Sequence, residues 1–273
     1  MNELNTRGLF RDFRPHLTIG CLLEATETAV VLNTPPGLAT GRHACTSGEL
    51  QRYSPSTCGT ITGDLPKSAL GSSWISKAGS ATASKLGPGN QAIVPTAWNL
   101  SVTMSGLLLS SKPLTIGFDI RCDNNVVASM GKGCVYPGVK PSLTLSKTGT
   151  ASGVAVHVGK AISSGLPSTL TRTTPTLATK NRTKACPSSL MRDPGYECDE
   201  YPFASSTQGA ASGGSARVPS GCRWTSVSGS GATGWSRCQV LKEQNHRGGT
   251  QLGDLYRNNR VLPGDQYVVR VVA

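Results

Sequence analysis

The chain has 273 residues, of which 37% are hydrophobic and 15% are charged, and its formal net charge is +12. This length can bury a core in one large domain or two ordinary ones, and the sequence has no apolar run long enough for a membrane-spanning helix. A content of 32 Gly and 17 Pro favours short strands and turns over long helices. The basic charge attracts polyanions, chiefly nucleic acid or an anionic surface, although basic proteins without such a partner are also common.

The first part of the chain is predicted to be β-rich and to end near Gly117. Turn-forming segments such as NTPPG and KLGPGN interrupt its early part, and QAIVPTAW, NLSVTMSGLLL and LTIGFDIRC then show the partial alternation that is typical of antiparallel strands. Near the start, basic residues precede a short apolar segment from Leu17 to Leu23, which is a poor match to a signal peptide. We expect residues 1–117 to form a β-rich region of unknown role.

Residues 118–273 predict an α+β domain, and they carry 18 Lys and Arg against 9 Asp and Glu, a net charge of +9. SGVAVHVGKAIS places Ala155, Val158 and Ile162 on one face of a helix, and PTLATKNRTKAC is typical of a short basic helix. GTQLGDLYRNN has apolar residues at helical spacing before an Asn-Asn terminator. The segments PSLTLSKTG, SRCQVL and GDQYVVRVVA predict strands.

The nine cysteines indicate disulfides rather than a zinc site, because no C-x-x-C pair occurs. Eight of them are sequential neighbours around Gly-, Pro- or Ser-rich loops of hairpin size, and such disulfides form in oxidising compartments. Scattered buried thiols are the alternative. We expect an extracellular protein in which Cys21 is left over and the pairs are Cys45–Cys58, Cys122–Cys134, Cys186–Cys198 and Cys222–Cys238.

One segment, GYECDEYPFASSTQG from Gly195 to Gly209, gathers acidic residues that are scarce elsewhere, with Glu197, Asp199 and Glu200 within four positions. The motifs of several other enzyme classes do not occur: G-x-S-x-G, H-E-x-x-H, a Walker loop, and G-x-G-x-x-G after a strand. SGSGATG is glycine-rich, but it lies between two cysteines and is interpreted as a disulfide-closed surface loop.

CDEYPFASS and the later block VLKEQNHRGGTQLGDLYRNNRVLPGDQYVV resemble the signatures of the NucA/NucB-type deoxyribonucleases, which are small, secreted, metal-dependent bacterial endonucleases. IRCDNN, GCVYPGVKPSLTLS and HVGKAISSGLPS extend the similarity, so that it covers roughly residues 118–273. The resemblance implies a minimal ββα-metal-type nuclease domain in which an aspartate replaces the usual histidine base. The insertion from Gly221 to Trp235 departs from the family pattern.

The resemblance also assigns catalytic roles. Asp199, directly after the cysteine, is the expected base, and Glu243, five residues before the Gly-Gly pair, is the expected metal ligand. Asn245 is a further candidate ligand or orders water around the metal. Carboxylate oxygens suit a hard cation, Mg²⁺ or Mn²⁺, and a nearby carboxylate off the metal accepts the proton of the attacking water. The structural alternatives are a turn role for Asp199 and a helix first-turn role for Glu243.

His246 is the alternative base of the His-metal type, although a solvent-exposed histidine is the preferred interpretation. Glu197 and Glu200 are expected to be solvated or ion-paired. Tyr201 and Phe203 are expected in the core. The candidate phosphate contacts are Arg247, Arg257 and Arg260.

The function expected from these residues is that of a secreted, monomeric, divalent-metal-dependent endonuclease that acts on DNA with little sequence selectivity and has no membrane partner. One alternative is a nucleic-acid-binding module without catalysis. Another is a delivered toxin nuclease with the same chemistry, for which a small acidic protein inhibitor would be the partner.

Overall fold

The computed structural model describes side chains for residues 86–93 and 119–273, and elsewhere it describes only the backbone of strands. The chain divides into two compact units, Met1–Gly138 and Val139–Ala273. Cys21 and the expected pair Cys45–Cys58 lie outside the described side chains.

The first unit is built from β-strands. Its main sheet has the order β12-β11-β10-β4-β6, with β7 also paired to β4. The strands are β1 (His16–Ile19), β2 (Glu24–Thr26), β3 (Ala29–Val31), β4 (His43–Arg52), β5 (Ile61–Thr62), β6 (Asp64–Leu65), β7 (Ser68–Ala69), β8 (Ile75–Ala78), β9 (Ser80–Ala81), β10 (Gln91–Met104), β11 (Leu114–Asn124) and β12 (Lys132–Val135).

The end of this unit corrects the boundary expected at 117/118. β11 runs through that position to Asn124 and pairs with β12 in antiparallel register, with Cys122 opposite Cys134. A disulfide joins these two cysteines. Because a strand paired on both sides cannot be divided between two domains, the division falls after Gly138.

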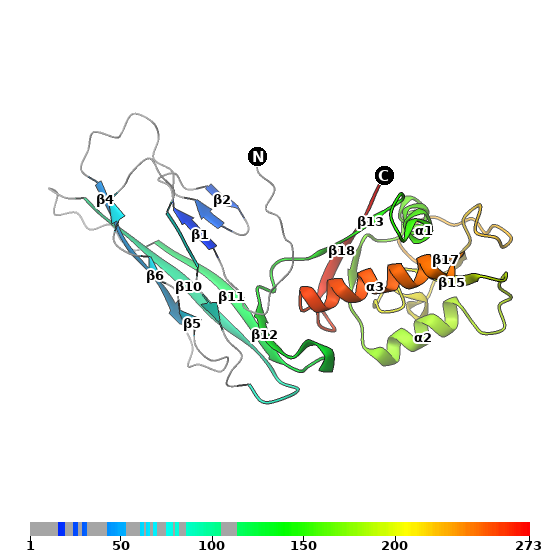
Figure 1. The fold of residues 1–273 in the computed structure, drawn as a ribbon, viewed down its shortest axis with the longest axis horizontal. Helices are drawn as coiled ribbons and strands as arrows, with labels where there is room; N and C mark the ends of the chain where they lie inside the picture. The colour runs from blue at the N-terminus through cyan, green and yellow to red at the C-terminus, as the bar shows by residue number, and fades with distance from the viewer. Residues whose placement is uncertain are drawn as a thin grey trace. The chain divides into compact units, whose positions relative to one another are not determined.

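The second unit is α+β, as the sequence predicts, and contains three α-helices and two three-stranded sheets among its described residues (Figure 1). One sheet has the order β13-β18-β14 and the other β15-β17-β16. The elements are β13 (Ser142–Ser146), α1 (Ser152–Ser163), β14 (Thr169–Thr171), α2 (Pro175–Ala185), β15 (Tyr196–Tyr201), β16 (Ala216–Arg217), β17 (Trp235–Leu241), α3 (Lys242–Asn258) and β18 (Gln266–Val272).

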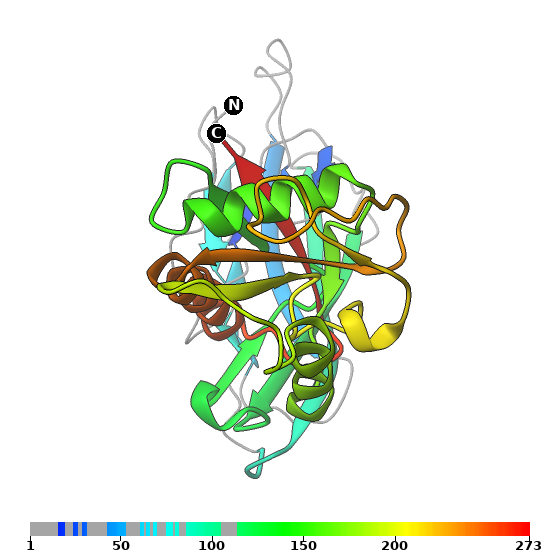
Figure 2. The same cartoon turned by 90° about the vertical axis from the view of Figure 1, so that its right-hand side faces the viewer.

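Helices α1 and α3 pack closely because glycines lie where they meet. A Cβ on Gly248 of α3 would lie 3.0 Å from a methyl group of Val154, and a Cβ on Gly153 of α1 would lie 2.4 Å from the Gln244 amide oxygen. The Gly153 N–H donates to that oxygen at 2.9 Å. In Figure 2, α1 (green) lies beside β17, and the strand runs into α3. This packing fixes α1 over the sheet that carries the acidic motif.

Candidate active site

The acidic motif lies in a ββα unit. β15 pairs with β17 in antiparallel register, and β17 is followed directly by α3, since Leu241 ends the strand and Lys242 begins the helix. The only disulfide between β17 and a neighbouring loop in the described chain, Cys222–Cys238, lies at the middle of the strand. Strand, strand and helix therefore form one continuous support for the motif.

The strand period divides the three carboxylates of the motif between two faces. Side chains alternate along a strand, and residues directly opposite each other on neighbouring strands share a face. Asp199 pairs opposite Cys238 and Glu197 opposite Val240, on the face that α1 and α3 cover. Glu200 directly follows Asp199 in the strand, so its side chain points to the other face, toward Arg182 of α2. Only Glu197 and Asp199 are therefore available to a common site.

Asp199 is buried, with a side chain that is 9% exposed, and its Oδ2 lies 2.6 Å from Nδ1 of His157 on α1. The other ring nitrogen, Nε2, lies 2.8 Å from Oγ of Ser236 on β17. His157 and Ser236 are 1% and 0% exposed. These three side chains form a hydrogen-bonded chain that links α1 to both strands.

Glu197 contacts the first turns of α3. Asn245 donates its Nδ2 to Glu197 Oε2 at 3.1 Å, and His246 Nε2 lies 3.3 Å from the same oxygen. The His246 side chain is 62% exposed, as expected for a surface histidine, and that of Glu197 is 31% exposed. Among the described residues no group of three or more His, Cys, Asp or Glu side chains has the arrangement of a metal site.

Glu243 lies away from this group. It stands nine positions before the buried Leu252, so at about 100° per residue the two point to opposite sides of the helix. Its side chain is 82% exposed and forms an i,i+4 ion pair with Arg247 at 3.8 Å. The metal-binding role that the sequence assigns to Glu243 stays a prediction.

The three candidate phosphate-binding arginines occupy different environments. Arg247 and Arg257 are exposed on α3, at 59% and 50%, and Arg257 is ion-paired with Asp254. Arg260 is only 3% exposed and follows the helix in a left-handed backbone conformation. This burial leaves little of the Arg260 side chain accessible to a DNA phosphate, and its phosphate-contact role stays a prediction. Tyr201 and Phe203 are buried in the core, as predicted.

Glu200 is a largely buried carboxyl group behind the site, with a side chain that is 13% exposed. Burial, with a further contribution from the Asp199 carboxylate, raises its pKa from 4.5 to about 7, although Arg182 opposes this shift. Arg182 Nε lies 3.8 Å from Glu200 Oε1. Because the folded protein holds this proton more tightly than the unfolded chain, the contribution of Glu200 to stability is present below pH 4.5 and is lost as the pH rises toward 7.

We therefore expect the free energy of unfolding of the unmodified protein to fall between pH 4.5 and 7 relative to Glu200→Gln, by about 3 kcal/mol at most. Urea unfolding of both proteins at several pH values, in EDTA, measures the difference. Asp193→Asn is the matched control, since Asp193 is 43% exposed in its ion pair with Arg223. A difference between the Glu200→Gln variant and the unmodified protein that does not change with pH would contradict the prediction.

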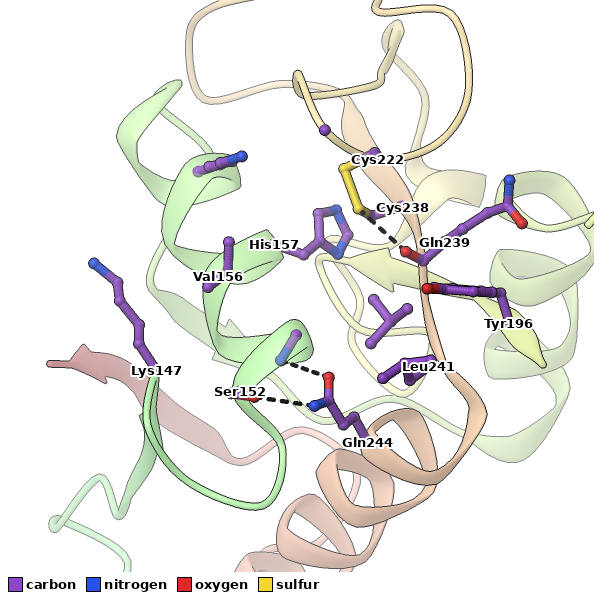
Figure 3. Close-up of a pocket in the computed structure, with 14 residues that line it drawn as sticks. Lys147, Ser152, Val156, His157, Tyr196, Cys222, Cys238, Gln239, Leu241 and Gln244 are labelled. Atoms are coloured by element: carbon purple, nitrogen blue, oxygen red, sulfur yellow. Dashed lines mark hydrogen bonds between the residues drawn. A yellow bond between two sulfur atoms is a disulfide. The ribbon is translucent and has the colours of Figure 1, made fainter. Parts of the chain in front are cut away.

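A cavity of about 290 Å³ lies beside His157, between α1 and β17 (Figure 3). Val156, Val240 and the Cys222–Cys238 disulfide form apolar parts of its wall, and Lys147 and Lys160 also line it. None of the catalytic, metal-binding or phosphate-binding residues that the sequence predicts is part of its lining. The cavity therefore adjoins the chain of hydrogen bonds through His157 without including Asp199.

The insertion after Cys222 is tied to the end of α1 by Arg217, which is 4% exposed. Its Nη1 donates to the carbonyl and hydroxyl oxygens of Ser164 at 2.9 and 2.7 Å. Its Nη2 donates to carbonyl oxygens of the insertion at 2.7–3.0 Å, those of Ser230, Gly231 and Thr233. Together with the Cys186–Cys198 and Cys222–Cys238 disulfides, both present as expected, these bonds hold the loops around the ββα unit.

Sequence reasoning did not identify His157 or Ser236. A histidine among the valines of a helix that is otherwise apolar on that face signals a buried polar group that needs partners. No comparable signal exists for Ser236, because serine is common in this chain and only strand register places it opposite Tyr201.

Comparison with known proteins gives a family match in the C-terminal part of the chain. A search of curated proteins finds no match. Residues 159–270 match the family model described as Deoxyribonuclease NucA/NucB, which covers Asp199, Glu243 and Asn245 and begins two residues after His157.

Proposed function

We propose that the protein is a secreted, divalent-metal-dependent endonuclease that hydrolyses DNA with little sequence selectivity, because residues 159–270 match the family model described as Deoxyribonuclease NucA/NucB. The family match supports nuclease activity on DNA. The observation that carries the proposal is the placement of Asp199 and Glu197 on one face of a ββα unit, next to the amide of Asn245.

The proposed chemistry divides the work between these side chains. As water attacks the phosphorus atom, it must lose a proton, and the bond to the departing 3′ oxygen must break. Asp199 is the proposed proton acceptor, because one of its oxygens is held by His157 while its side chain keeps 9% exposure to solvent. The exposed Arg247 and Arg257 are the proposed phosphate contacts.

The oxygen-rich donor set fits a hard divalent cation such as Mg²⁺ or Mn²⁺. Magnesium is usually bound by one or two carboxylates with water and substrate phosphates rather than by a full protein cage. The residues proposed to hold it are Glu197 and Asn245, with Glu243, which the sequence favours, as the alternative carboxylate. A cation bound there supplies neutralisation of the negative charge on the phosphoryl and departing oxygens.

Plasmid DNA incubated with the purified protein tests this proposal. We expect nicking and linearisation with Mg²⁺ or Mn²⁺ and none with EDTA. Cleavage that is insensitive to EDTA would remove the metal from the proposal. Binding without cleavage under any metal would favour a nucleic-acid-binding module, and cleavage of RNA alone would change the substrate.

DNA binding is expected to depend steeply on salt and little on sequence, because the candidate contacts are phosphate-directed arginines. If about four phosphates are neutralised, affinity falls about 10²-fold between 50 and 200 mM salt. Fluorescence anisotropy with the Asp199→Asn variant, which is expected to cleave the probe only slowly, measures this. Arg247→Gln should reduce the salt slope by about one, and Lys140→Gln, an exposed residue far along the chain from the motif, should not. A flat salt dependence would contradict the phosphate-contact model.

An extracellular location and a monomeric state are part of the proposal. The three disulfides of the described chain are compatible with an oxidising compartment. Within the described residues, no helix combines the length and apolarity that crossing a bilayer requires.

A further inference from the structure

The side chains of Asp199, His157 and Ser236 form a chain with the connectivity of a serine-hydrolase triad, but their burial excludes that use. Nδ1 of His157 faces the carboxylate at 2.6 Å, and Nε2 faces the serine hydroxyl at 2.8 Å. A nucleophilic serine must meet its substrate, and in hydrolases it stands exposed on a sharp turn. Ser236 is 0% exposed in the interior of β17. The function of this chain of hydrogen bonds must therefore lie with Asp199 or His157 and not with Ser236 as a nucleophile.

The directions of the two hydrogen bonds indicate that Asp199 is the residue whose position the chain fixes. A carboxylate only accepts hydrogen bonds, so Nδ1 of His157 carries the proton and donates it to Asp199 Oδ2. In the neutral ring Nε2 is then an acceptor for the Ser236 hydroxyl, which holds the ring in this tautomer. Among the described residues, His157 is the only hydrogen-bond partner of the Asp199 side chain.

The surroundings leave the histidine ring one orientation. His157 lies on the buried face of α1, and α1 is held near the sheet by the close contacts of Gly153 and Gly248. Ser236 and Asp199 belong to neighbouring strands in fixed antiparallel register. The ring is thus held by contacts with three elements, α1, β15 and β17. Through its hydrogen bond it fixes Oδ2 of Asp199, while the other carboxylate oxygen has no hydrogen-bond partner among the described residues.

We propose that His157 is a positioning residue, which fixes the Asp199 carboxylate so that its second oxygen faces the attacking water, and that Ser236 sets the tautomer of the ring. This inference rests on the proposed nuclease function. Its physical basis is that a misplacement of about 1 Å at a reacting group costs about 10² in rate. In this proposal the chain of hydrogen bonds holds the Asp199 carboxylate in place, and no proton moves along it during turnover.

Two substitutions of the ring separate its two nitrogens. In His157→Asn the amide replaces Nδ1 and keeps a donor toward Asp199, whereas in His157→Gln it replaces Nε2 and removes that donor. We expect His157→Gln to lower kcat about 10²-fold with KM for DNA unchanged within about threefold, and His157→Asn to lower kcat less than about tenfold. Ser236→Ala should lower kcat by less than about tenfold, and it provides the test if the histidine variants do not fold.

A double-mutant cycle distinguishes positioning from general damage. In an Asp199→Asn background, His157→Gln should cause no further loss of rate. The proposal is overturned if His157→Gln keeps the wild-type kcat, or if it lowers the rate by the same factor in both backgrounds. Melting temperatures of all variants show whether each one folds.

Failure of the nuclease function has a separate signature. If the unmodified protein does not cleave DNA with Mg²⁺ or Mn²⁺, the proposed function fails. The hydrogen-bond chain is then decided by ¹⁵N spectra of the His157 ring. A ring protonated on Nδ1 in the unmodified protein, with that signal changed in Asp199→Ala, supports the inference, and a ring protonated only on Nε2 overturns it.

Discussion

Asp199→Asn is expected to lower the rate of DNA cleavage by about 10²- to 10⁴-fold, the usual contribution of a positioned base, while the fold and DNA affinity are kept. The substitution removes the proton acceptor but keeps an oxygen that can accept the hydrogen bond from His157 Nδ1. The buried surroundings of residue 199 therefore change little, and the loss should appear in kcat rather than in KM.

Cleavage of a labelled duplex under saturating metal measures this loss, and Glu200→Gln is the matched control. It makes the same carboxyl-to-amide substitution one residue away, on the opposite face of β15, where the carboxyl group contacts Arg182. Its rate should stay within a few-fold of the unmodified protein. If Asp199→Asn still cuts while His246→Ala is inactive, the base is misassigned and the site is of the His-metal type.

Glu197→Gln is expected to raise the Mn²⁺ concentration for half-maximal cleavage by at least about tenfold, with activity partly restored at high Mn²⁺. Removing the charge of a carboxylate ligand weakens a site for a hard cation. Glu197 shares a face with Asp199 and contacts Asn245, which is why we favour it as the ligand. The change should appear in the metal dependence and not in DNA affinity.

Glu243→Gln gives the direct comparison, because the sequence assigns the metal to this residue. With a side chain that is 82% exposed and paired with Arg247, it should shift the Mn²⁺ requirement by less than about threefold. Isothermal titration of Mn²⁺ into both variants reports metal affinity without turnover. A large shift in Glu243→Gln with none in Glu197→Gln would return the ligand role to Glu243.

The elements of residues 139–273 could be predicted where one face is continuously apolar. α1 spans Ser152–Ser163, the segment whose Ala155 and Val158 are both 0% exposed. α3 spans Lys242–Asn258, so it joins the predicted segment that starts at Gly249 to the first-turn position considered for Glu243, across two adjacent glycines that oppose helix formation. Contact with Val154 explains why Gly248 is nevertheless accommodated there.

The site was predictable only in part, for a similar reason. Asp199 could be identified by its place in a long motif, whereas the choice between Glu197 and Glu243 depends on which face of β15 meets which side of α3. That relation is set by strand register and by helix packing across dozens of residues. The partnership of His157 with Ser236 joins positions 79 residues apart, and no local pattern expresses it.

Arg217 and the Cys222–Cys238 bridge also bear on what happens if the chain is cut. A protease that nicks the exposed Gly/Ser-rich stretch around Ser226 to Ser230 would leave one covalent molecule, because both new ends lie inside the disulfide-closed loop. The Arg217 guanidinium would still donate hydrogen bonds to the carbonyl oxygens of Gly231 and Thr233, which lie on the C-terminal side of the break. Proteolysis in this loop would therefore yield a two-chain form whose ββα unit is unaltered and whose two chains separate only after reduction.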